Sequence, residues 1–192
     1  MPSNHRQVAG LLLFVAGVEC ILGIIIAEAL YSGYSASLNY ISDLGIGPSA
    51  SIFNSAVFLL GVLSVCGAYF VWKAFNSKLF TIVLALSGVG AMGVGVLTEN
   101  ILPVHAAFSI MLFASAGISA IVSFKVVKSW FSYISAVLGI IALIALVLMV
   151  SGNDLGLGVG GMERMIAYPT LLWMVGFGAR LIGETDTDAR KK

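Results

Sequence analysis

Residues 131–150 read FSYISAVLGIIALIALVLMV, a run that contains no charged side chain. An α-helix rises 1.5 Å per residue, so about 20 apolar residues cross the roughly 30 Å of hydrocarbon in a bilayer. A membrane β-barrel would need strands that alternate polar and apolar residues, and this run does not alternate. The stretch therefore predicts a transmembrane helix.

Five further apolar runs of similar length occur in the chain. The six predicted spans are Val8–Leu30, Ser51–Ala74, Leu79–Leu97, His105–Phe124, Phe131–Val150 and Met165–Ile182. Each backbone polar group needs an internal partner in lipid, which favours helices throughout. The predicted fold is all-α, a polytopic transmembrane bundle of six helices.

The overall composition agrees with a bilayer as the main solvent. Hydrophobic residues make up 59% of the 192 positions and charged residues 10%, whereas soluble domains carry about 25% charged residues. The formal net charge of +1 provides no basic field for nucleic acid. The expected partners are membrane lipids, and possible protein partners are other membrane subunits or a second copy of the chain.

Basic residues predict the orientation of the bundle. If the N-terminus is cytoplasmic, nine of the ten Lys and Arg residues lie inside and only Arg164 lies outside. An even number of crossings then places the C-terminus inside as well. We predict a multi-pass protein of the plasma membrane with both termini cytoplasmic, made of a transmembrane domain at 1–183 and a charged cytoplasmic tail at 184–192.

The first polar motif is ISDLGIGPS at 41–49, in the longest predicted outer loop. Its apolar residues suggest that the loop lies at the membrane interface. Asp43 could serve as a base, as a cation ligand or as an acceptor that fixes the loop. The structural alternative is an Asx-turn or an N-cap on a short interfacial helix.

The second motif is TENILPVH at 98–105, between the third and fourth spans. It gathers Glu99, Asn100 and His105 around a proline. Histidine titrates near neutral pH and suits proton transfer, so His105 and Glu99 join Asp43 as candidate catalytic residues. The alternative reading makes His105 an interfacial residue at the start of its helix.

The third motif is GGMERMIAYP at 160–169, at the entry to the last span. It contains Glu163, Arg164 and Tyr168, which with Asn100 form the candidate ligand-binding set. Arg164 could hold a phosphate or a carboxylate through two parallel hydrogen bonds. The favoured alternative is an ion pair with Glu28, Asp43 or Glu99, because unpaired charge near hydrocarbon is costly.

Glu19 is the one acid predicted to lie deep in the membrane. It follows Val8 by eleven residues, which places it near the midplane of the first span. A charge at that depth is costly, so Glu19 is expected to be neutral or to accept hydrogen bonds inside the bundle. The first run is also too long for a signal peptide and is read as a retained helix.

Counting residues excludes several kinds of site. One histidine at the outer face rules out a three-histidine zinc centre, and no CxxC, Walker A, HExxH or GxSxG motif occurs. Cys20 and Cys66 both lie in apolar runs and are expected to behave as small hydrophobic residues. We therefore predict no metal and no cofactor.

Three motifs together carry a resemblance to a known family. ISDLG after the first span, EN..P.H after the third and ER...YP at the start of the sixth resemble a family of small six-helix prokaryotic membrane proteins, known only as a domain of unknown function. The resemblance implies a six-helix fold and marks Asp43, Glu99, His105, Glu163 and Arg164 as the family's polar positions. It implies no activity.

Three functional hypotheses follow. The first is an outward-facing site at those five residues that binds or processes a lipid head group or a small polar molecule. The second is a non-catalytic accessory subunit or scaffold of a larger membrane complex, in which the same residues lock the outer loops onto the helices. The third and weakest is a proton-coupled transporter that uses Glu19.

Overall fold

The computed structural model describes residues 2–189 of the chain, and this part contains six long helices. They are α1 (Pro2–Leu30), α2 (Ala50–Phe75), α3 (Lys78–Val96), α4 (Leu102–Val122), α5 (Trp130–Val150) and α6 (Gly158–Ala189). Each contains a stretch long and apolar enough to cross a membrane. The prediction of an all-α bundle with six membrane helices is confirmed.

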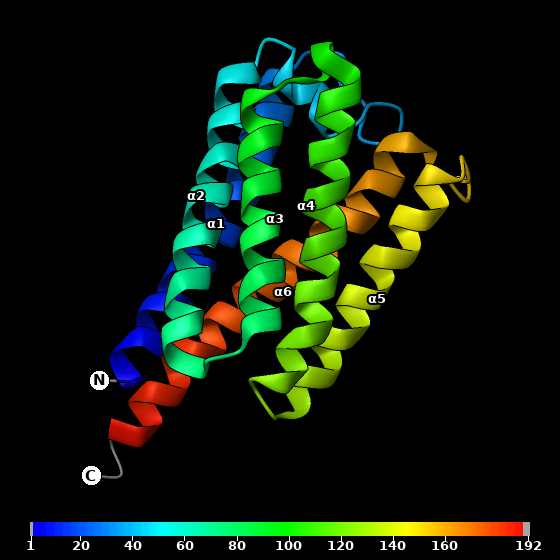
Figure 1. Cartoon of the computed structure of the whole chain (residues 1–192). Helices are drawn as coiled ribbons and strands as arrows, with labels where there is room; N and C mark the ends of the chain where they lie inside the picture. Colours follow the sequence, from blue (N-terminus) through cyan, green and yellow to red (C-terminus); the bar gives the residue numbers. More distant parts are fainter. Residues whose placement is uncertain (1, 190–192) are drawn as a thin grey trace.

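Helices that follow one another in sequence pack side by side, and α6 closes the bundle by packing against α1 as well as α5. In Figure 1, α6 runs obliquely behind α3 and α4, from the end where α1 begins to the far end of α5. The beginning of α1 and the end of α6 lie at the same end, as an even number of crossings requires. We call the opposite end, which carries residues 31–49, 97–101 and 151–157, the distal end.

Several helices extend beyond the limits predicted from hydropathy, and α1 and α6 do so most. α1 begins at Pro2 instead of Val8, and α6 runs from Gly158 to Ala189 instead of Met165 to Ile182. Hydropathy marks where apolar sequence ends, whereas backbone hydrogen bonding continues into polar sequence. As a result, Glu163 and Arg164 lie within α6 and not in the loop before it.

Small residues bring α3 close to both of its neighbours. A Cβ atom on Gly88 would lie 2.8 Å from the carbonyl oxygen of Gly61 in α2, and one on Gly90 would lie 2.6 Å from the backbone nitrogen of Leu112 in α4. Such distances leave no room for a side chain. The helices therefore pack tightly at these glycines, as small residues allow between membrane helices.

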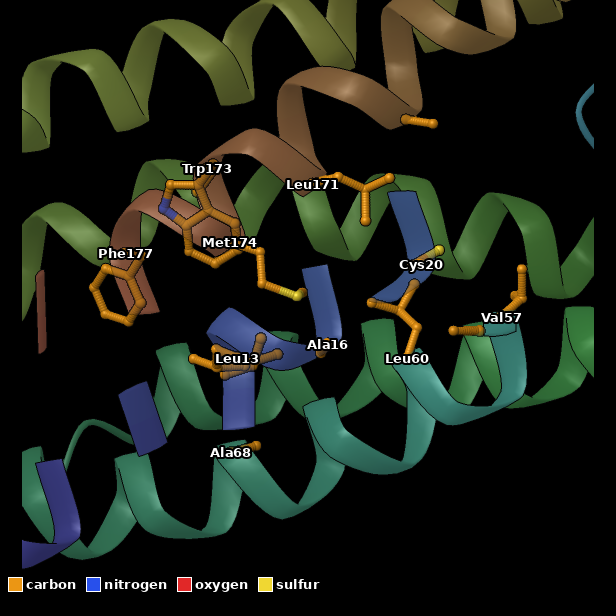
Figure 2. Packing of buried hydrophobic residues seen from close by; sticks show 14 of the residues in the cluster. Leu13, Ala16, Cys20, Val57, Leu60, Ala68, Leu171, Trp173, Met174 and Phe177 are labelled. Carbon is orange, nitrogen blue, oxygen red and sulfur yellow. The ribbon is translucent and has the colours of Figure 1, made fainter. Parts of the chain in front are cut away.

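Aromatic side chains fill the core toward the termini. Trp173 and Phe177 of α6 are stacked with ring centroids 5.5 Å apart, and Phe80 of α3 meets Phe177 edge to face. Figure 2 shows Trp173 and Phe177 beside Leu13 of α1. The Trp173 indole donates to the Ser123 hydroxyl at 3.3 Å, so its polar atom is satisfied inside the bundle.

The end that carries the termini also has an exposed aromatic rim. Tyr69, Trp130 and Tyr133 are 55%, 72% and 67% exposed. Amphipathic rings of this kind suit the boundary between lipid and water.

Candidate functional site

The candidate site begins with the loop at 31–49, which folds back over the distal end and rests on α6. The backbone nitrogen of Gly160 donates to the Ser37 carbonyl at 3.0 Å. A Cβ atom at Gly160 would lie only 1.9 Å from the carbonyl oxygen of Asn39. Glycine is therefore required here by a close approach of two backbones.

Arg164 holds this loop and does not face an open site. Its Nη1 donates to the carbonyl oxygens of Ala36 at 2.7 Å and Gly160 at 2.9 Å. Its Nη2 donates to the Glu28 carboxylate and to the Tyr34 hydroxyl. The guanidinium thus joins α1, the loop and α6, and the predicted ion pair is formed with Glu28.

Glu163 fastens the next part of the loop. Its side chain is buried, with 6% of the residue exposed, and its Oε2 accepts the backbone N–H of Ile41 at 2.5 Å. Ile41 is itself buried, so its N–H has no access to water. Without Glu163 this donor would be unsatisfied, which is costly in an apolar surrounding.

Asp43 organises the loop from inside. It lies in the short 3₁₀ helix η1 (Ser42–Gly45), and its Oδ2 accepts from the Asn39 side chain and from the Tyr40 backbone, both at 3.0 Å. The bonds run back to the preceding turn, so Asp43 does not cap η1. This is the loop-fixing acceptor considered from the sequence.

Glu99 meets Asp43 across the distal end. It lies in the 3₁₀ helix η2 (Glu99–Ile101), and its carboxyl contacts the side chains of Asp43 and Ser42. Its Oε2 is buried and has no hydrogen-bond partner among the described residues. A hydrogen bond between two carboxyl groups requires a proton on one of them, so Glu99 and Asp43 share a proton.

His105 lies close to this pair at the start of α4. Its ring is buried, and Nδ1 is 2.7 Å from the carbonyl oxygen of Leu97. A carbonyl oxygen only accepts, so Nδ1 carries the hydrogen and Nε2 is left as an acceptor in the neutral ring. Glu99 is within electrostatic reach of the ring, so Asp43, Glu99 and His105 are indeed neighbours.

Two tyrosines of the loop complete the polar environment. Burial raises the pKa of the Tyr40 hydroxyl, and the charges of Glu163, Glu99 and Asp43 raise that pKa further. Burial also raises the pKa of Tyr34, although its hydrogen bond to Arg164 opposes the change. Both hydroxyls therefore stay protonated near neutral pH and are able to donate hydrogen bonds.

The predicted site residues fall into two groups. The carboxyl cluster, as we call it, consists of Asp43, Glu99 and Glu163, with Tyr40 and His105 beside it. The arginine clamp consists of Arg164, Glu28 and Tyr34, and the Tyr168 side chain also contacts Arg164.

Asn100 and Glu19 belong to neither group. Asn100 is exposed at the distal end. Glu19 is partly buried in the middle of α1, and its Oε1 is buried with no hydrogen-bond partner in the part of the chain described.

A cavity lies beneath η1, inside the bundle. It has about 530 Å³ of empty space, including its open mouth. Its apolar lining includes Cys20, Val57, Leu60 and Leu171, whose side chains are labelled in Figure 2. Its polar lining residues are Ser42, Ser109, Glu163 and Thr170.

The carboxyl cluster and the cavity are joined by shared residues. Glu163 belongs to both, and Ser42 contacts Glu99 while it lines the cavity. His105 lies one helical turn before Ser109, on the same face of α4. Within residues 2–189, no group of three or more His, Cys, Asp and Glu side chains is placed to hold a metal ion.

Comparison with known proteins identifies the family. The model of a family described as "Protein of unknown function (DUF998)" matches residues 14–180. The chain belongs to this family. DUF998 membership together with six apolar helices makes the protein an integral membrane protein that crosses the bilayer several times, and it confirms the resemblance found in the sequence. No curated protein and no solved structure gives a match to this DUF998 chain.

The sequence did not reveal the loop residues that complete the site. Tyr34 lies 130 positions before Arg164, and Ile41 lies 122 positions before Glu163. No spacing rule relates residues so far apart. The one available signal was that Arg164 is the only basic residue predicted at this end, which indicated a nearby acid without identifying which acid.

Proposed function

We propose that the protein binds a small amphiphile, a lipid or a lipid-like molecule, at the distal end of the bundle. The apolar part of the ligand would occupy the cavity beneath η1, and its polar head would lie at the carboxyl cluster. The observation that carries this proposal is the cavity itself, which is lined mainly by hydrocarbon side chains together with Ser42, Glu163 and Thr170. Binding sites for small molecules commonly combine apolar walls with a few polar groups.

The role of Arg164 changes in this proposal. Its guanidinium is fully engaged with Glu28, Tyr34 and two backbone carbonyls, so it serves the site by holding the loop that covers the cavity. Glu163 and Ser42, which line the cavity, would contact the ligand. The proposal is for binding and includes no chemical step.

The test is native mass spectrometry of the protein purified in lipid nanodiscs, with bound amphiphiles identified after release. Val57 lines the cavity and is 5% exposed, so Val57→Phe should fill the cavity and remove the bound molecule. Ala167→Leu adds volume to the same cavity from a different helix. Val137→Phe, on a side chain of α5 that is 53% exposed, is the matched control.

We expect the wild type and Val137→Phe to carry the amphiphile, and both cavity variants to lose it while keeping their melting temperatures close to wild type. A wild-type protein without any bound amphiphile would overturn the proposal. Equal occupancy in all four proteins would do the same.

A second candidate function rests on the arginine clamp. The hydrogen bonds of Arg164 and Glu163 fix the loop rigidly, as expected for a preformed surface that a membrane partner recognises. An accessory subunit of this kind should co-purify with its partner after gentle solubilisation. A monomer that is recovered alone would count against it.

A further inference from the structure

We infer that two copies of the protein pair in the membrane through α1, and that the Glu19 side chains of the two copies hydrogen-bond to each other. This pairing is independent of the amphiphile site, because Glu19 is not among the residues that line the cavity. Glu19 is distinctive in its depth in the bilayer, in an oxygen atom without a partner, and in its place beside side chains of α1 that other helices leave open.

Glu19 lies near the midplane of its span. Residue 17 is the centre of Asn4–Leu30, the membrane stretch of α1, and Glu19 lies two residues beyond it, about 3 Å along the helix. Its Oε1 atom is buried and has no hydrogen-bond partner among residues 2–189. The described ion pair joins Arg164 to Glu28 and leaves Glu19 without a basic partner in that part of the chain. A lone carboxylate at this depth is costly, so Glu19 is a neutral acid with one O–H donor to satisfy.

The side of α1 around Glu19 faces away from the bundle. Val15, Leu22 and Ile26 are 40%, 53% and 48% exposed. Together with Glu19 they follow one another at spacings of four, three and four residues, the spacing that lines up side chains along the contact between two paired helices. The described helices leave this stripe open, and a single polar residue within such a stripe fixes the register of a helix pair.

A second copy supplies the group that Glu19 lacks. The hydrocarbon chains of lipids offer neither a donor nor an acceptor, so a neutral carboxyl that faces them is unsatisfied. Copies in one membrane share an orientation, so a symmetric pair has its two-fold axis along the membrane normal and brings Glu19 against the same residue at the same depth. A neutral carboxyl has both a donor and an acceptor, so each of the two donates one hydrogen bond and accepts one. No charge is buried in this arrangement.

A different membrane protein is the competing partner for this stripe. A partner with a lysine or an arginine at the same depth would form an ion pair with a charged Glu19, whereas a second copy pairs with a neutral one. Glu19→Gln separates the two cases, because the amide keeps a donor and an acceptor but cannot carry a charge. Glu19→Leu removes the hydrogen bonds in both.

The experiment counts copies by single-molecule photobleaching of the full chain, fused to a C-terminal fluorescent protein, in liposomes over a series of protein-to-lipid ratios. We expect the wild type and Glu19→Gln to dimerise with similar midpoints. Glu19→Leu should need at least about fivefold more protein per lipid, which is the scale of two hydrogen bonds between membrane helices. Tyr133→Leu, on a side chain of α5 that is 67% exposed, is the control for an added leucine and should dimerise like the wild type.

Cross-linking tests the contact face without any change at Glu19. In a background with Cys20→Ala and Cys66→Ala, Leu22→Cys should form disulfide-linked dimers when the membranes are oxidised, because a disulfide requires the two Cα atoms to approach within about 7 Å. Val137→Cys, on a side chain of α5 that is also 53% exposed, should stay monomeric. Cross-links at Val137→Cys but not at Leu22→Cys would place the contact on another helix and overturn the inference.

The photobleaching results can contradict the pairing in three further ways. Monomers at every protein-to-lipid ratio would overturn it, as would dimers whose midpoint is the same in Glu19→Leu as in the wild type. Loss of dimers in Glu19→Gln equal to that in Glu19→Leu would also overturn it, because the pairing would then require an acid that can be charged.

Discussion

At the residue scale, the distal end shows how few charges a membrane protein needs to organise a loop. Arg164 and Glu163 are adjacent in α6, yet they bind different partners because they point to different sides of the helix. Arg164 reaches Glu28 in α1, whereas Glu163 receives the N–H of Ile41 in the loop. Both contacts satisfy polar groups that would be costly to leave unpaired near hydrocarbon.

The arginine clamp makes a prediction about loop exchange. Arg164→Lys keeps the charge but loses the planar fork that contacts three segments at once. Hydrogen bonds of charged groups are worth about 1.5–3 kcal/mol, so amide hydrogen exchange at 36–41 should accelerate roughly tenfold or more. The measurement is hydrogen exchange by mass spectrometry in nanodiscs.

Arg6→Lys is the matched control for this change. Arg6 lies at the other end of the molecule, above the Phe75 ring at 4.9 Å. Exchange at 36–41 should stay at the wild-type rate in this variant. If Arg164→Lys exchanged no faster than Arg6→Lys, Arg164 would not be what holds the loop.

At the element scale, α6 has three roles along its length. Its beginning supports the loop through Gly160, Glu163 and Arg164. Glu163 and Thr170 line the cavity, and the later part of the helix carries the aromatic core. Pro169 lies within the helix and has no N–H to donate to the preceding turn. The Thr170 hydroxyl donates to the Ala167 carbonyl at 2.8 Å and so does not replace the donor that the Met165 carbonyl lacks.

Two neighbouring glycines of α6 should respond oppositely to alanine. Gly160→Ala would place a Cβ atom 1.9 Å from the Asn39 carbonyl oxygen, so the loop must move. Gly161→Ala meets only the Leu157 side chain at 3.0 Å, while alanine favours the helix by up to about 1 kcal/mol. We expect Gly160→Ala to lower the melting temperature in detergent, at a cost of about 1–3 kcal/mol.

Gly161→Ala serves as the control for this experiment. Its melting temperature should equal or exceed that of the wild type. Equal melting temperatures for the two variants would show that the contact between α6 and the loop does not contribute to stability.

At the scale of the whole molecule, the two ends differ in chemistry. The end with the termini carries Lys73 and Lys78 at the adjoining ends of α2 and α3, and Lys125 and Lys128 between α4 and α5. The distal end carries the carboxyl cluster. This asymmetry is the basis of the predicted orientation, with the termini in the cytoplasm. Because the proposed site lies at the distal end, it would then face outward.

Cysteine labelling tests that orientation directly. In a background with Cys20→Ala and Cys66→Ala, a single Ser151→Cys at the distal end should react with an impermeant maleimide added to intact cells. Lys78→Cys, at the exposed first residue of α3 at the other end, should react only after the membrane is opened. Labelling in the reverse order would place both termini outside.

The sequence alone predicted the six membrane helices, the shared side of the termini and the gathering of Asp43, Glu99, His105, Glu163 and Arg164 at one end. These features follow from hydropathy and charge, which can be read from short stretches of neighbouring residues without knowing the tertiary structure. It could not predict the limits of α6, because hydrogen bonding continues beyond the apolar run.

Only the tertiary structure decided which acid pairs with Arg164, which buried N–H Glu163 receives, and that a cavity lies beneath η1. These depend on how helices from distant parts of the chain cross and approach one another. Small residues set those approaches, such as Gly160 of α6 where it meets the loop and Gly88 of α3 where it meets α2. A local pattern gives the element and its side of the membrane, whereas a contact between residues more than a hundred positions apart is fixed by packing.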